Sequence, residues 1–122
     1  MSNNVILIAD DEPWQRMWIS QILHHAGYTC RAVGDGESVV EYALALEPAL
    51  IVLDVHLPGI DGLEAARQLR ILPNTRHVPI IFVTSFFADQ ERVMRAAVER
   101  SDWLLKPFHP DDLIHRIRRL IG

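Results

Sequence analysis

Cysteine is almost absent from the chain, since Cys30 is the only one in 122 residues. A single cysteine cannot form an internal disulfide, so a reducing, cytoplasmic location is expected. The chain also lacks any apolar run approaching the roughly 20 residues that a membrane-spanning helix needs. Its first four residues, Met1–Asn4, carry neither the basic region nor the apolar core of a signal peptide.

An excess of basic residues is missing as well. The chain has 12 Lys and Arg residues against 16 Asp and Glu residues, a formal net charge of −4. Because binding to a phosphate backbone requires a basic face, we expect no direct nucleic-acid binding by this domain. The hydrophobic share of 49% is typical of a globular protein, and the length suits one domain over residues 1–122.

Short apolar runs alternate with longer amphipathic stretches along the chain. Val5–Ala9 is continuously apolar, which is typical of a strand buried on both faces. The alternation predicts strands at 5–9, 28–33, 50–53, 79–83 and 103–105, and helices at 13–26, 38–46, 63–72, 89–99 and 110–121. Five such strand–helix units imply an α/β fold, a parallel sheet covered by helices on both faces.

Polar residues stand where the predicted strands end. Asp10 and Asp11 follow the first strand, Asp54 the third, Thr84 the fourth and Lys106 the fifth. In open parallel sheets, sites lie beyond the carboxyl ends of the strands, where the strand order reverses. We therefore expect all five side chains to converge at one edge of the sheet.

Three carboxylates at one edge repel one another unless a cation compensates them. Mg²⁺ prefers oxygen ligands, keeps several waters and typically takes one or two carboxylates. Asp11 and Asp54 are the expected direct ligands, and Asp10 binds directly or through water. The backbone carbonyl of His56 is placed to give one more oxygen.

Lys106 adds a positive charge to the same edge. It can pair with Asp54 at rest and with a phosphoryl oxygen afterwards, and Thr84 offers a hydroxyl donor. A carboxylate flanked by a metal ion, an ammonium group and a hydroxyl suits phosphoryl transfer, which depends on positioning and charge neutralisation.

Four motifs resemble those of response-regulator receiver domains (CheY-like) in two-component signalling. They are Asp10-Asp11-Glu12-Pro13, the segment Leu53–Gly62, Val83-Thr84-Ser85, and Leu105-Lys106-Pro107-Phe108. The motifs stand in the family's order and spacing, and the resemblance covers the whole chain. It implies a single flavodoxin-like (βα)5 domain with a five-stranded parallel sheet of strand order 2-1-3-4-5.

The resemblance also implies a function. Asp54 would be the phosphoacceptor for a histidine kinase or a histidine phosphotransfer protein, with Mg²⁺ held by Asp10 and Asp11. Such a domain is a signalling switch rather than an enzyme, although it assists its own phosphorylation and dephosphorylation.

The switch itself is implied in the same way. Thr84 would move toward the phosphoryl group, and the aromatic side chain of Trp103 would change rotamer with it. The face formed by the fourth helix, the fifth strand and the fifth helix would report the state. The peptide bond between Lys106 and Pro107 would be cis, which an X–Pro bond tolerates.

Three features depart from the family pattern. Glu99–Asp102 replaces a Gly-Ala pair, which suggests a different helix cap. The switch aromatic is Trp103 rather than tyrosine or phenylalanine. Phe86 and Phe87 stand where small or polar residues are common, and they could shape partner choice or restrict water.

Two points stay open between alternatives. His56 either tunes hydrolysis of the aspartyl phosphate or is a plain loop histidine. Arg116 either pairs with Asp112 one helical turn away or, together with Asp102 and Arg95, crosses a symmetric homodimer interface, as in the winged-helix branch of the family.

Two other classes of protein share part of the pattern. A haloacid-dehalogenase-like phosphatase needs a second acidic residue two places after the nucleophile, where this chain has His56. A flavin-binding domain of the same fold needs a phosphate-binding loop after the first strand, where Asp10–Glu12 would repel phosphate.

Overall fold

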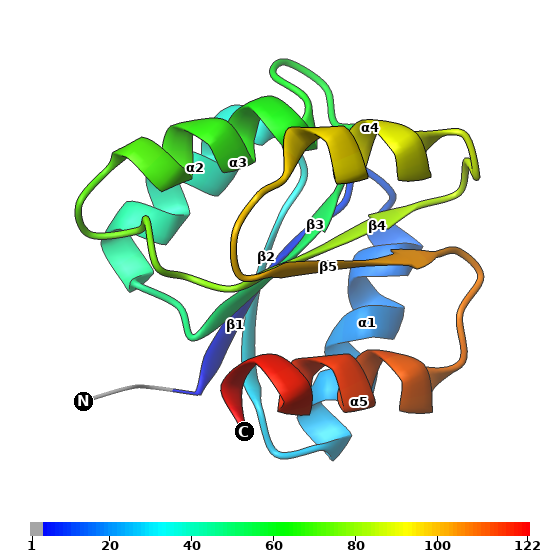
Figure 1. Cartoon of the computed structure of the whole chain (residues 1–122). Coiled ribbons are helices and arrows are strands. Elements are labelled where there is room, and N and C mark those ends of the chain that lie inside the picture. The colour runs from blue at the N-terminus through cyan, green and yellow to red at the C-terminus, as the bar shows by residue number, and fades with distance from the viewer. Residues whose placement is uncertain (1–3) are drawn as a thin grey trace.

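Five strands alternate with five helices along residues 4–122, the part of the chain that the computed structural model describes (Figure 1). The strands are β1 (Val5–Ala9), β2 (Thr29–Val33), β3 (Leu50–Asp54), β4 (Ile80–Thr84) and β5 (Ser101–Leu105). The helices are α1 (Pro13–His25), α2 (Gly36–Leu46), α3 (Gly62–Ile71), α4 (Asp89–Ala96) and α5 (Pro110–Ile121). Residues 1–3, which belong to the segment predicted not to be a signal peptide, lie outside the described residues.

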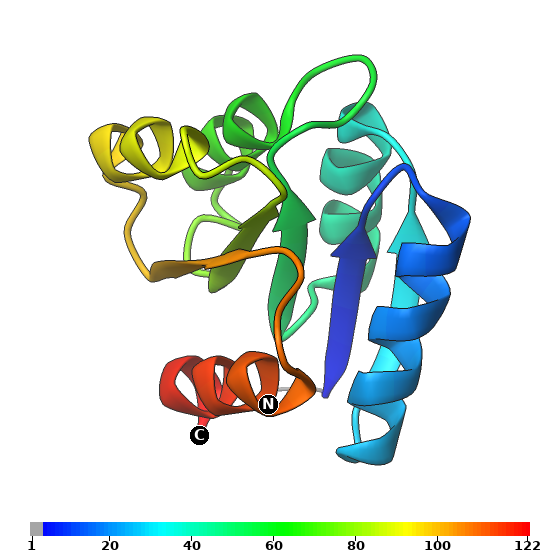
Figure 2. The ribbon, with the colours of Figure 1, turned by 90° about the vertical axis from the view of Figure 1, so that its right-hand side faces the viewer.

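All five strands pair in parallel, in the order β2-β1-β3-β4-β5, which confirms the predicted fold. The chain runs from β1 outward to β2 and then returns past β1 to β3, so the strand order reverses between β1 and β3. Figure 2 shows the arrowheads of these strands pointing toward the same edge. Sites in open sheets form at this reversal.

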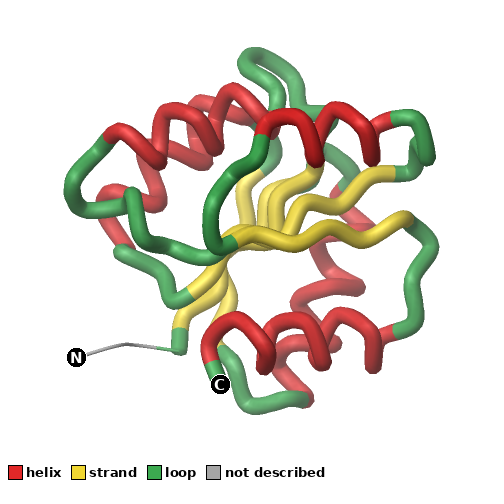
Figure 3. The backbone as a smooth tube through the Cα atoms, viewed as in Figure 1, coloured by secondary structure: helices red, strands yellow, loops and turns green. Residues whose placement is uncertain are grey.

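Helices cover both faces of the sheet (Figure 3). One apolar cluster packs the sheet against α2, α3 and α4, and a second packs the other face against α1 and α5. Every residue of β3 and β4 is buried, as expected for central strands with helices on both sides. In β2, at the edge, only Val33 is buried. None of the described helices is long and apolar enough to cross a membrane.

The predicted end of the fourth helix is wrong. The sequence placed it at residue 99, but α4 ends at Ala96, and Ala97 adopts the left-handed conformation with φ of 48°. Arg70 of α3 donates hydrogen bonds to the carbonyl of Glu99. This contact between distant parts of the chain fixes residues 97–100 as a turn, and β5 consequently starts two residues early, at Ser101.

Candidate functional site

The sheet register brings the strand-end residues together. Ala9 of β1 pairs with Leu53 of β3, so the next residues, Asp10 and Asp54, leave adjacent strands side by side. On the other side of β3, Asp54 pairs with Val83 of β4, next to Thr84. The register therefore brings Asp10, Asp54 and Thr84 to the predicted edge.

Asp54 is the centre of the cluster, and its side chain is only 8% exposed. Its Oδ1 atom accepts a hydrogen bond of 2.9 Å from the backbone N–H of His56, and its Oδ2 atom accepts one of 2.9 Å from Lys106. Burial raises the pKa of Asp54, and neighbouring Asp10 adds to the rise, while these two donors lower it in part.

Lys106 is the only lysine in the chain. Its ammonium group contacts two carboxylates at once, Oδ2 of Asp10 and Oδ2 of Asp54, each at 2.9 Å. Burial alone would lower the pKa of Lys106, but the two carboxylates outweigh it and hold the pKa above its ordinary value. The buried ammonium group is therefore kept charged by its partners.

Asp10, Asp11 and Asp54 have a geometry that suits a metal ion, because carboxylate oxygens of the three lie within 4.8 Å of one another. Asp10 is fully buried, and its oxygens already accept from Lys106 and from the backbone of Glu12. Asp11 is exposed. Three carboxylates against one ammonium leave an excess of negative charge, and all the donors are hard oxygens. The donor set therefore fits Mg²⁺.

The loop after Asp54 is held by a glycine at the start of α3. The backbone N–H of Gly62 donates to the carbonyl of Val55 at 2.8 Å. A Cβ atom on Gly62 would lie 2.2 Å from the backbone oxygen of Asp54. Only glycine allows α3 to begin this close to the site, so Gly62 helps to position both Asp54 and the loop that carries His56.

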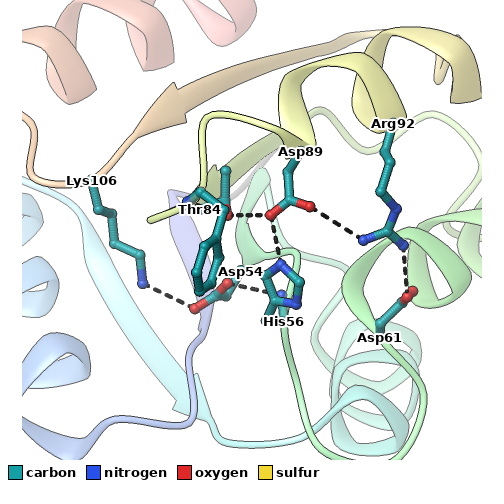
Figure 4. Close-up of polar contacts among 8 residues, drawn as sticks. Asp54, His56, Asp61, Thr84, Asp89, Arg92 and Lys106 are labelled. Atoms are coloured by element: carbon teal, nitrogen blue, oxygen red, sulfur yellow. Dashed lines mark hydrogen bonds and ion pairs between the residues drawn. The ribbon is translucent and has the colours of Figure 1, made fainter.

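Thr84 lies at the predicted edge, but its hydroxyl group does not contact Asp54. It lies 2.6 Å from Oδ2 of Asp89 (Figure 4). It also accepts a hydrogen bond from the backbone N–H of Phe86. Asp89 was not among the site residues predicted from the sequence. An acidic residue in a first helical turn has an ordinary explanation in the helix dipole, and no spacing rule links it to Thr84.

His56 contributes in two ways. Its backbone reaches Asp54, while Nε2 of its imidazole ring lies 2.6 Å from Oδ2 of Asp89 (Figure 4). The ring also packs edge-on against Phe86, with 5.0 Å between ring centroids. Phe86 and Phe87 are exposed. The imidazole ring of His56 is thus held by contacts with Asp89 and Phe86.

The other predicted switch residue, Trp103, is half-buried on β5 against the core that faces α2, α3 and α4. Arg116 of α5 donates to the carbonyl of Trp103 at 2.9 Å and to the carboxylate of Asp102 at 2.8 Å. Of the two alternatives left open for Arg116, the pairing with Asp112 is therefore wrong, because Arg116 faces β5 and pairs with Asp102 of the same chain. The Lys106–Pro107 bond is cis, as predicted.

The comparisons with known proteins agree with this geometry. Residues 6–118 match the family model of the response regulator receiver domain. The chain is 36% identical over 113 residues to the transcriptional regulatory protein HprR of Escherichia coli, covering 93% of this chain and 49% of that protein. It spans about half the length of the curated relatives it matches.

Two solved structures show the same likeness. One is the receiver domain of the sensor histidine kinase PA1611 from Pseudomonas aeruginosa, with a magnesium ion in its active site cleft (TM-score 0.89, 33% identity, 99% of both chains covered). The other is the response regulator TrrA from Thermotoga maritima in complex with Mg²⁺ and BeF (TM-score 0.84, 28% identity, 98% and 99% covered).

The chain belongs to the response regulator receiver family. It is a receiver domain of two-component signalling, a class of signalling switch. The alternatives of a haloacid-dehalogenase-like phosphatase and of a flavin-binding domain are therefore set aside.

Proposed function

We propose that Asp54 accepts a phosphoryl group from a histidine kinase or a histidine phosphotransfer protein in a Mg²⁺-dependent reaction. The observation that carries this proposal is the contact of one buried carboxylate with a buried ammonium group, next to two further carboxylates. A carboxylate oxygen of Asp54 attacks phosphorus in line, and the bond from phosphorus to the donor breaks. The electron pair of that bond leaves with the donor group.

Each residue of the site has its own role in this reaction. Asp11 and Asp54 would ligate Mg²⁺ directly, Asp10 directly or through water, and the carbonyl of His56 would add one oxygen. The bound ion would neutralise phosphoryl charge. Lys106 exchanges its contact with Asp54 for one with a phosphoryl oxygen, and so keeps a partner for its buried charge.

The α4-β5-α5 face would then report the phosphorylation state of Asp54. Thr84 at the end of β4 would turn toward the phosphoryl group, and Trp103 on β5 would change rotamer. We propose this face as the output surface and as the surface of a homodimer. Asp102 and Arg116 already pair within one chain, so dimer formation would have to re-pair them. We further propose that residues 1–122 act as one cytoplasmic domain.

The test is intact-mass spectrometry after incubation with acetyl phosphate, with and without Mg²⁺. We expect one phosphoryl adduct on the wild-type chain with Mg²⁺, and none with EDTA or on Asp54→Asn. The asparagine variant keeps the side-chain shape, so circular dichroism should show an unchanged fold. An adduct of equal yield on Asp54→Asn would refute the assignment.

A further inference from the structure

Asp89, the first residue of α4, is a charged residue buried to 5% exposure. Its carboxylate receives three hydrogen bonds: Oδ2 lies 2.6 Å from the hydroxyl of Thr84 and 2.6 Å from Nε2 of His56, and Oδ1 lies 3.3 Å from Arg92 (Figure 4). Donor groups of three side chains thus converge on the two oxygens of this carboxylate, the arrangement expected of an ionised acceptor.

The ionised state of Asp89 fixes the direction of its bonds. A carboxylate can only accept, so the hydroxyl of Thr84 must give its single proton to Asp89. The oxygen of the same hydroxyl accepts from the backbone N–H of Phe86 at 3.1 Å. Thr84 consequently has no proton left for a phosphoryl oxygen on Asp54 while the contact with Asp89 persists.

A role in helix capping does not account for these contacts. Ala88 is the N-cap residue of α4, and it makes no side-chain cap hydrogen bond. Two of the three partners of Asp89 lie outside α4, since Thr84 ends β4 and His56 follows β3. The carboxylate of Asp89 thus joins separate elements of the site.

The third partner of Asp89 extends the network toward α3. Arg92 also contacts Oδ2 of Asp61 at 3.1 Å, and Asp61 caps α3 by accepting from the backbone of Glu64. The loop after Asp54 and the start of α4 are therefore tied together through Arg92 (Figure 4). A change in the bonds of Asp89 would reach both α3 and α4.

We propose that Asp89 is a positioning residue that holds the hydroxyl of Thr84 and the imidazole of His56 in the unphosphorylated form, and thereby opposes occupation of Asp54. The inference rests on the proposed function of Asp54. Phosphorylation succeeds only when the phosphoryl oxygens take the Thr84 proton from the Asp89 carboxylate. The free-energy cost of this exchange sets how readily Asp54 is phosphorylated. The exchange also removes the hydrogen bond between Thr84 and Asp89 at the start of α4.

The test is a double-mutant cycle on affinity for beryllofluoride, used with saturating Mg²⁺ as the phosphoryl mimic. Titrations followed by tryptophan fluorescence compare wild type, Asp89→Ala, Thr84→Val and the double variant. We expect Asp89→Ala to bind about tenfold more tightly than wild type, the worth of one charge-assisted hydrogen bond. In the Thr84→Val background the same change should alter affinity by less than about twofold.

Each outcome decides the matter. An equal gain in both backgrounds would show that Asp89 does not act through the hydroxyl of Thr84, and this would overturn the inference. No gain from Asp89→Ala in the Thr84 background would overturn it as well. If the alanine variant does not fold, Asp89→Ser takes its place, because serine is small, polar and too short to bridge Thr84 and His56.

The controls separate this inference from the proposed function. Asp54→Asn should abolish beryllofluoride binding. If wild type with Mg²⁺ also failed to bind, the proposed function would fail and the role of Asp89 with it. If wild type binds beryllofluoride but the four proteins do not show the predicted differences in affinity, Asp54 remains the acceptor and only the role of Asp89 is refuted.

Discussion

The ammonium group of Lys106 lies 2.9 Å from Oδ2 of Asp54, although Lys106 follows β5 and Asp54 ends β3, two strands that are not neighbours. β4 lies between β3 and β5, so the lysine side chain reaches across the end of β4. The same ammonium group also donates to Oδ2 of Asp10, the residue after β1, at 2.9 Å. One side chain from one edge of the sheet therefore neutralises charge at the point where the strand order reverses.

The burial of Lys106 predicts slow chemical modification. Its raised pKa leaves little neutral amine at pH 8, and its side chain is only 8% exposed. We expect acetylation of Lys106 to be at least about tenfold slower than in the urea-unfolded chain, measured by peptide mass after timed exposure to an acylating reagent in EDTA. Because Lys106 is the only lysine, one peptide reports the result.

Two variants sharpen the acetylation experiment. Asp54→Asn removes one of the two carboxylates that hold the ammonium group, so acetylation of Lys106 should accelerate. Thr84→Val is the matched control, since Thr84 does not contact Lys106, and its rate should equal that of wild type. Equal rates in Asp54→Asn and wild type would contradict the pairing.

The raised pKa of Asp54 predicts a stability gain when its charge is removed. A carboxyl with a folded-state pKa above its unfolded value binds its proton more tightly in the folded state. The ionised carboxylate of Asp54 therefore destabilises the folded state at pH 7. This destabilisation is lost as pH falls toward the pKa of an aspartate in the unfolded chain, about 4.

Asp54→Asn should accordingly raise the thermal midpoint in EDTA at pH 7 by a few degrees, where about 4 °C corresponds to roughly 1 kcal/mol in a domain of this size. The difference in thermal midpoint between Asp54→Asn and wild type should become smaller toward pH 4. It should also narrow in Mg²⁺, which stabilises only the wild-type carboxylate cluster. A variant less stable than wild type in EDTA would contradict this account.

The close approach of Gly62 to the backbone of Asp54 predicts a steric effect on stability. An alanine Cβ atom would lie 2.2 Å from the backbone oxygen of Asp54, so backbone atoms must move. We expect Gly62→Ala to lose about 2 kcal/mol of unfolding free energy in urea denaturation, within the range of overpacked sites.

Gly34→Ala is the control for Gly62. Its Cβ atom would lie 3.1 Å from Nη1 of Arg16, a side-chain atom that donates to the backbone carbonyl of Asp10. A small shift of this side chain relieves the contact and no backbone atom has to move, so the loss should stay below about 1 kcal/mol. Equal losses at the two positions would show that the close approach of Gly62 to Asp54 is not what requires glycine there.

The sequence carried enough information for the placement of the site. Alternating apolar runs fix the parallel sheet, and a parallel sheet brings the residues after its strands to one edge. Asp10, Asp54 and Lys106 could therefore be placed together before any coordinates were known. Asp10 and Lys106 directly follow a strand and Asp54 ends one, so the direction of the strands is enough to bring them to one edge.

The network around Thr84 could not be predicted in the same way. The contact of Asp89 with Thr84 depends on how α4 packs, and that position is set by many side chains distant in sequence. The same limit explains the end of α4, which depends on Arg70 from α3, and the partner of Arg116. Local spacing favoured Asp112 for Arg116, but the packing of α5 against β5 placed Asp102 closer.

The most direct test of the central claim is to locate the phosphoryl group. Borohydride reduces an aspartyl phosphate to homoserine, so peptide mapping after treatment with acetyl phosphate, Mg²⁺ and borohydride identifies the modified residue. We predict homoserine at position 54 and unmodified aspartate at positions 10 and 11. Homoserine at either of those two positions, with Asp54 intact, would contradict the account.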